Sequence, residues 1–209
     1  NLIEGHHNLV QPVALAAGTD CELGWIYNLD VAVTASNDSN PFAGGCIPSS
    51  YVAGTDVLQI RYAEATEPAA LQTDQAYIRS NFSNGRIFIG TTAPVLDSHE
   101  DSPLTLNHEL HAYAYYVSDF TDAPGDGLPS LRRVALVKGP SLEDQVMLSG
   151  VTRMEVQFGV DTTGDKIVDS YVDPSAGLDT STIVSAKIWL LMRSDDNQSN
   201  VKAKTFSMA

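Results

Sequence analysis

From Thr55 onward the sequence is divided into short runs of alternating apolar and polar residues, rich in valine, isoleucine, threonine and tyrosine. A period of two residues is typical of half-buried β-strands, and the glycine, proline, asparagine and aspartate between the runs favour turns. In the first run, "TDVLQIRYAEA", the pattern predicts that Leu58, Ile60 and Tyr62 face the core. We therefore expect the chain to fold around a β-sheet.

Two of these runs are expected to form a hairpin. "AYIRSN" and "RIFIGTT" flank the tetrapeptide "FSNG". The pair Asn84-Gly85 predicts a type I′ turn, because that turn needs a positive φ at both central positions. Further strands are predicted at residues 111–120, 131–139, 146–161 and 182–194. The third of these is one long strand or two strands broken near Gly150, and the last is a strand or, alternatively, a helix.

Residues 1–54 have no clear period. "VALAAG" at 13–18 is compatible with a short helix, and "WIYNLDVAV" at 25–33 with helix or strand. We thus predict a β-rich α+β fold in one domain, 1–209, with 1–54 irregular or helical and 55–209 mostly β-strands. The sequence contains no apolar run of 18 or more residues, so none of it is expected to span a membrane.

The two cysteines, Cys21 and Cys46, both lie in turn-rich sequence. They are either free thiols or a disulfide, and the flexible glycines beside Cys46 favour the disulfide. A bridge would close a loop of 26 residues, which stabilises a chain by about 3 kcal/mol in the chain-entropy model. It would also indicate an oxidising compartment.

The formal net charge is −14, from 26 acidic and 12 basic residues. Nucleic acids and anionic membrane surfaces are bound by clusters of lysine and arginine, so this balance argues against both. It is compatible with a secreted, soluble protein or with one that binds cations such as calcium.

An acidic segment, "DTTGDKIVD", predicts the most specific binding site. Asp161, Asp165 and Asp169 recur every four residues, Gly164 allows a sharp turn, and Asp173 is a fourth candidate ligand. Calcium is bound by several carboxylate and carbonyl oxygens that converge from a flexible loop. The segment differs from the EF-hand pattern, because Thr163 stands where an acid is expected. The alternative is a hairpin turn that binds nothing.

No constellation typical of an enzyme is found in the sequence. His108 and His111 are three residues apart, and in a strand they would face opposite sides, which prevents them from chelating one metal ion. There is no G-x-S-x-G motif for a nucleophile and no glycine-rich phosphate loop. We therefore predict no catalytic residues and no cofactor other than calcium.

Four stretches follow one another in a characteristic order: "GTDVLQIRYAEA", "HAYAYYVSDFTDAPGDGLPSLRRVAL", "LSGVTRMEVQFGVDTTGDKIVDSYV" and "IVSAKIWLLMRS". They cover roughly residues 54–194. In order and spacing they resemble the PilW family of type IV pilus minor pilins.

The resemblance implies a pilin-type globular head that in the family follows a long apolar N-terminal helix, which we expect to be truncated here. It implies a structural role in priming pilus assembly and in a tip complex, supporting adhesion, twitching motility or DNA uptake. The implied partners are other minor pilins, the major pilin and a tip adhesin. The implied location is the periplasm and the cell-surface pilus, with inner-membrane anchoring through the helix before assembly.

Two alternative functions remain open at the level of sequence. A minor pseudopilin of a type II secretion system would share the architecture but serve protein export. A secreted calcium-dependent carbohydrate-binding or adhesin domain would carry an exposed aromatic platform beside the acidic loop.

Overall fold

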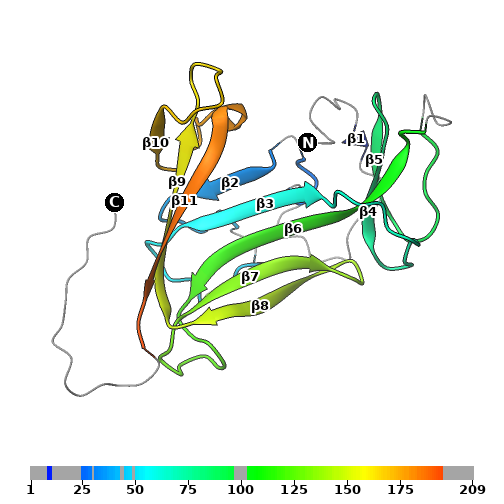
Figure 1. Ribbon diagram of the computed structural model, residues 1–209. Helices are drawn as coiled ribbons and strands as arrows, with labels where there is room; N and C mark the ends of the chain where they lie inside the picture. Colours follow the sequence, from blue (N-terminus) through cyan, green and yellow to red (C-terminus); the bar gives the residue numbers. More distant parts are fainter. Residues whose placement is uncertain are drawn as a thin grey trace, which may run out of the picture.

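The computed structural model describes residues 9–10, 25–29, 31–42, 45–48, 50–96 and 103–194, and Figure 1 shows how their strands are arranged. Apart from the 3-10 helix Thr180–Thr182, every regular element in these ranges is a β-strand. The prediction of a β-rich fold is confirmed. The α-helical part of the predicted α+β fold is not found in these ranges. At residues 25–33, where helix or strand was expected, residues 25–27 form a turn. The short helix expected at 13–18 lies outside the described residues.

The larger of two sheets has eight strands: β1 (Leu9–Val10), β2 (Val33–Ser36), β3 (Val57–Ala63), β4 (Ala76–Ser80), β5 (Gly85–Ile89), β6 (Leu106–Ser118), β7 (Ser130–Val137) and β8 (Ser141–Ser149). The long strand β6 organises this sheet, because it pairs with β4 at its start, with β3 along its middle and with β7 at its end. All pairs are antiparallel except that of β1 with β5.

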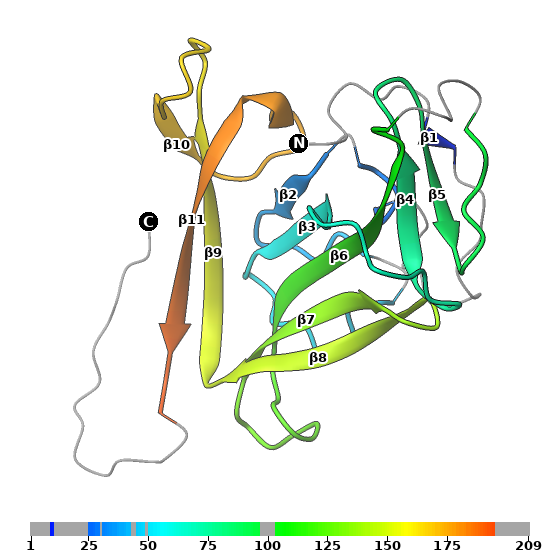
Figure 2. The same ribbon diagram turned by 45° about the vertical axis from the view of Figure 1, so that its right-hand side comes forward.

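The smaller sheet contains β9 (Val151–Val160), β10 (Ser170–Val172) and β11 (Ile183–Met192), with β9 in the centre. Gly150 separates β8 from β9 and has a φ of 77°, a left-handed conformation that glycine adopts without steric cost. The sequence 141–160 therefore forms two strands that belong to different sheets. Figures 1 and 2 show the smaller sheet standing across one end of the larger one. The strand alternative for residues 182–194 is confirmed.

Two apolar clusters lie on opposite faces of the larger sheet. Strand β6 contributes Leu110, Ala112, Ala114 and Tyr116 to the first cluster, which also contains the segment 25–29 and Phe42. The second cluster lies between β9 and the larger sheet, with Leu58, Val117, Val151, Met154, Val156 and Phe158. The strand predicted at residues 111–120 is thus confirmed as part of β6, and its alternate residues pack into clusters on opposite faces.

The prediction for β3 was wrong for one residue of three. Leu58 and Ile60 pack into the second cluster, but the side chain of Tyr62 is exposed (41%). The other face of this strand is equally buried, and Arg61 on that face donates to the carbonyl oxygens of Trp25 and Val31. Tyr62 is exposed because the second cluster extends along this face only as far as Ile60, and its ring stacks on that of His111 instead. The face that the pattern marks as polar is buried because Trp25 and Val31 lie against Arg61.

The predicted hairpin is confirmed, with β4 paired to β5 and Ser80 opposite Gly85. The predicted type I′ turn was wrong, because neither Asn84 nor Gly85 has a positive φ. The side chain of Asn81 instead holds the loop: its Oδ1 accepts from the backbone N–H groups of Ser83 and Asn84, each at 2.9 Å. Gly85 already belongs to β5, so the loop has four residues, 81–84, and Asn84-Gly85 are not the central pair of a two-residue turn.

Candidate functional site

The acidic segment predicted to bind calcium forms the loop between β9 and β10. Asp161 Oδ1 accepts from the N–H groups of Thr163 (3.0 Å) and Gly164 (2.6 Å), and its Oδ2 accepts from Lys166 N–H (2.7 Å). Burial alone would raise the pKa of Asp161, but these hydrogen bonds outweigh it and lower the pKa below the ordinary value. The carboxylate therefore stabilises the turn.

The other three predicted ligands, of which Asp173 follows β10, have separate partners. Asp169 accepts from the N–H and hydroxyl groups of Thr162, Asp165 accepts from Ile167 N–H, and Asp173 accepts from the side chain of Gln157. No three of the four carboxylates lie within 4.8 Å of one another in the described chain. Calcium binding at Asp161, Asp165, Asp169 and Asp173 stays a prediction.

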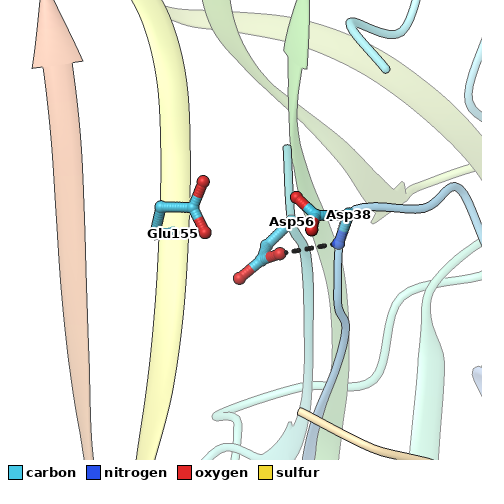
Figure 3. A group of neighbouring side chains, drawn as sticks. All are labelled: Asp38, Asp56 and Glu155. Carbon is cyan, nitrogen blue, oxygen red and sulfur yellow. Dashed lines mark hydrogen bonds between the residues drawn. The ribbon is translucent and has the colours of Figure 1, made fainter. Parts of the chain in front are cut away.

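A group of three carboxylates that the sequence did not indicate lies where the two sheets meet. The ligand atoms of Asp38, Asp56 and Glu155 are all within 4.8 Å of one another, and Figure 3 shows Asp56 between Glu155 on β9 and the backbone of Asp38. Asp56 is completely buried. Its Oδ1 accepts from Asp38 N–H (2.9 Å) and its Oδ2 from Val156 N–H (2.7 Å).

This carboxylate group joins the sheets, because Asp56 precedes β3 and Val156 lies in β9. Burial, more than the neighbouring Asp38, raises the pKa of Asp56 above its ordinary value, against the effect of the two hydrogen bonds. Arg153 supplies positive charge: its Nε donates to Glu155, and its Nη2 lies 3.8 Å from Asp38 Oδ1. The group is thus a charged, hydrogen-bonded link between the two sheets.

The histidines lie as the strand pattern predicted, on opposite faces of β6. His108 is buried. His111 lies on the outer face, where its ring stacks on Tyr62 with 4.8 Å between centroids and its Nε2 is 3.7 Å from Glu64. The two rings are not brought together, which agrees with the argument against a shared metal ion.

Cys46 is partly buried against the first apolar cluster, and none of the described cysteines is a free thiol. Its predicted partner, Cys21, lies outside the described residues. The pairing of these two cysteines stays a prediction.

Strand β11 carries an exposed row of apolar side chains, which we call the β11 row: Ile188, Leu190 and Met192, exposed to 49%, 38% and 49%. Their partners across the ladder on β9 are Val156, Met154 and Val151, all fully buried in the second cluster. Residues directly opposite in a ladder share one face of the sheet. The β11 row therefore continues the core-facing side of β9 beyond the edge of the larger sheet.

A second exposed apolar stretch, residues 146–148 of β8, ends near the same corner. Gly150 follows it, and the carbonyl of Gly150 accepts from Arg193 N–H, directly after β11. In Figures 1 and 2 the end of β8, the start of β9 and the end of β11 converge there. Within the described chain β8 pairs only with β7 and β11 only with β9, so both are edge strands.

In the described part of the chain, no helix is long and apolar enough to cross a membrane. Comparison with curated proteins and with solved structures gave no match. The model of one family, described as "Type IV Pilus-assembly protein W" (PilW), matches residues 114–209. The match begins within β6. Of the four stretches noted in the sequence, it contains nearly all of the last three. The first stretch, which includes β3, precedes the match. The resemblance of this chain to the PilW family of type IV pilus assembly is therefore confirmed over residues 114–209.

Proposed function

We propose that this chain is the globular head of a type IV pilus minor pilin and that it docks onto other pilus subunits through the β11 row. The match to a pilus-assembly family supports the general role. The observation that carries the docking surface is the exposure of Ile188, Leu190 and Met192 on the same side of the sheet as a buried core.

A row of this kind is suited to assembly for a physical reason. Large apolar side chains that are adjacent in space and uncovered are common at protein interfaces, whereas single ones are ordinary surface residues. The edge of β11 also offers backbone N–H and C=O groups to an added strand. The partners are other pilins, so the functional location is the cell envelope and the pilus. Priming of assembly and a place in a tip complex belong to this proposal; adhesion and twitching motility would follow from it.

The test is pairwise binding of the purified chain to the soluble heads of minor pilins from the same organism, measured by sedimentation and by pull-down. Ile188→Glu places a charge in the row, and we expect it to weaken binding by about tenfold or more, because a desolvated carboxylate without a partner is costly.

Lys187→Gln is the matched control. It makes the chain more negative by the same one charge, but Lys187 is the neighbour of Ile188 in β11 and points to the other side of the strand. Its ammonium lies over the ring of Tyr171. We expect this variant to bind like the unaltered chain. Equal affinities of the two variants, with equal melting temperatures, would exclude the β11 row as the docking surface.

A further inference from the structure

A cleft of about 700 Å³ lies between β2–β3 and the segment that follows β10. Its wall includes Trp25, Asn37, Gln59, Arg61, Phe158 and Ser175. It contains none of the carboxylates described above. Its size is in the ordinary range for small-molecule sites.

The side chain of Arg61 in this wall is buried, with 3% exposure. Its Nε donates to Val31 O at 2.9 Å, and its Nη1 donates to Trp25 O at 2.7 Å and Gln59 Oε1 at 3.3 Å. Nη2 has no acceptor in the described chain. Burial lowers the pKa of this guanidinium to about 10, and no carboxylate of the described residues counteracts it. The group therefore remains a cation at neutral pH, and it has no counter-charge among the described residues.

A second buried donor belongs to Trp25, which also lines the cleft. The indole Nε1 of Trp25 also has no acceptor among the described residues, and the backbone carbonyl of the same residue is bonded to Arg61. Buried donors in native proteins nearly always have a partner, and a buried charge is usually paired. Two unsatisfied donors and one uncompensated positive charge, in residues that line the same cleft, indicate an anionic acceptor.

We propose that the cleft binds a small organic carboxylate, which accepts hydrogen bonds from Arg61 Nη2 and Trp25 Nε1. A carboxylate matches the donors in number, with two oxygens, and in charge, with a single negative unit. A phosphate dianion would bring one further negative charge into a chain whose net charge is −14 and would find too few donors. The amides of Asn37 and Gln59 in the wall suit hydroxyl groups, as in a sugar acid.

The test is a titration of the full chain with glucuronate, with glucose and glucose 6-phosphate as matched probes, followed by the indole N–H signals in NMR spectra. The chain has two tryptophans, so Trp189 on β11 is an internal control. We expect glucuronate at millimolar concentration to shift the Trp25 signal saturably and to leave that of Trp189 unchanged. Glucose should shift neither signal.

Arg61→Met should abolish the glucuronate response while its melting curve shows a folded protein. If this variant fails to fold, the comparison of the three probes on the unaltered chain decides. The proposal is wrong if glucuronate has no effect on Trp25, if glucose acts equally, if glucose 6-phosphate binds more tightly, or if folded Arg61→Met still responds. The inference is independent of the β11 row, so pilin binding and ligand binding can fail separately.

Discussion

The most informative stability test is Asp144→Ala. Asp144 lies on β8 and accepts from Arg132 Nε on β7 (2.9 Å) and from the hydroxyl of Tyr116 on β6 (3.0 Å), so it connects three neighbouring strands. Tyr116 is fully buried and Arg132 nearly so. Without Asp144, the guanidinium of Arg132 keeps the carbonyl of Thr121 and the ring of Phe120 but loses its only carboxylate among the described ion pairs.

The expected loss follows from burial. Removing one partner of a fully buried ion pair costs about 3–5 kcal/mol. The side chain of Asp144 is 27% exposed, so water replaces part of the interaction, and we expect a loss of about 2–3 kcal/mol in the free energy of unfolding. For a chain of this length that is a fall of about 4–12 °C in Tm.

Urea and thermal unfolding, followed by circular dichroism at neutral pH, measure this loss. Glu143→Ala is the control, because Glu143 is the exposed neighbour on the same strand and accepts from Gln145; we expect it to change stability by less than about 0.5 kcal/mol. The double variant Arg132→Met/Asp144→Ala should lose less than the sum of the single losses. If Asp144→Ala and Glu143→Ala have the same stability, the three-strand connection does not stabilise the fold.

Three further predictions concern the loops and the smaller sheet. Gly159→Ala should destabilise by about 1–3 kcal/mol, because the new Cβ would lie 2.9 Å from Val168 Cγ2 and would also contact Ser185; Gly177→Ala, with open space around it, is the control in the same urea unfolding. Hydrogen bonds from backbone N–H groups, first that of Leu128, lower the pKa of Asp126 to about 2. Its contribution to stability is therefore present above about pH 4 and lost as the pH falls toward about 2, so acid titration of Asp126→Ala should show a smaller loss over that window. If the loop of Asp161 binds calcium, Tm should be higher in millimolar calcium than in EDTA; identical melting curves would contradict it.

The strands could be predicted where one face is buried and the chain alternates. Strand β6 shows this, since the alternation of Ala112, Ala114 and Tyr116 with their neighbours is visible in the sequence and exact in the structure. The prediction failed at Tyr62, because the second cluster extends along this face of β3 only as far as Ile60. It also missed the burial of Arg61 on the other face, which Trp25 and Val31 cover. A long-range cover of this kind leaves no trace in local periodicity.

The same limit applies to the functional features. Asp56 and the Val156 N–H that it binds are 100 positions apart, and Arg61 and Trp25 are 36 positions apart; no motif spacing connects them. The exposure of the β11 row was equally hidden, because its sequence reads like that of any apolar strand. What the sequence contained was the order of the PilW-like stretches, and these specify a family rather than a surface.

If the chain is a subunit of a fibre, as proposed above, the pairing of β11 with β9 has a mechanical consequence. The ladder runs from Ile183 to Met192, nearly the full length of both strands. A pulling force along the strand axis would be shared by all rungs at once, whereas a force across the strands would open them one after another from an end. A neighbouring subunit bound to Ile188 and Leu190 would thus transmit tension along β9. The hydrogen bond from Val156 to Asp56 would pass that tension to the larger sheet.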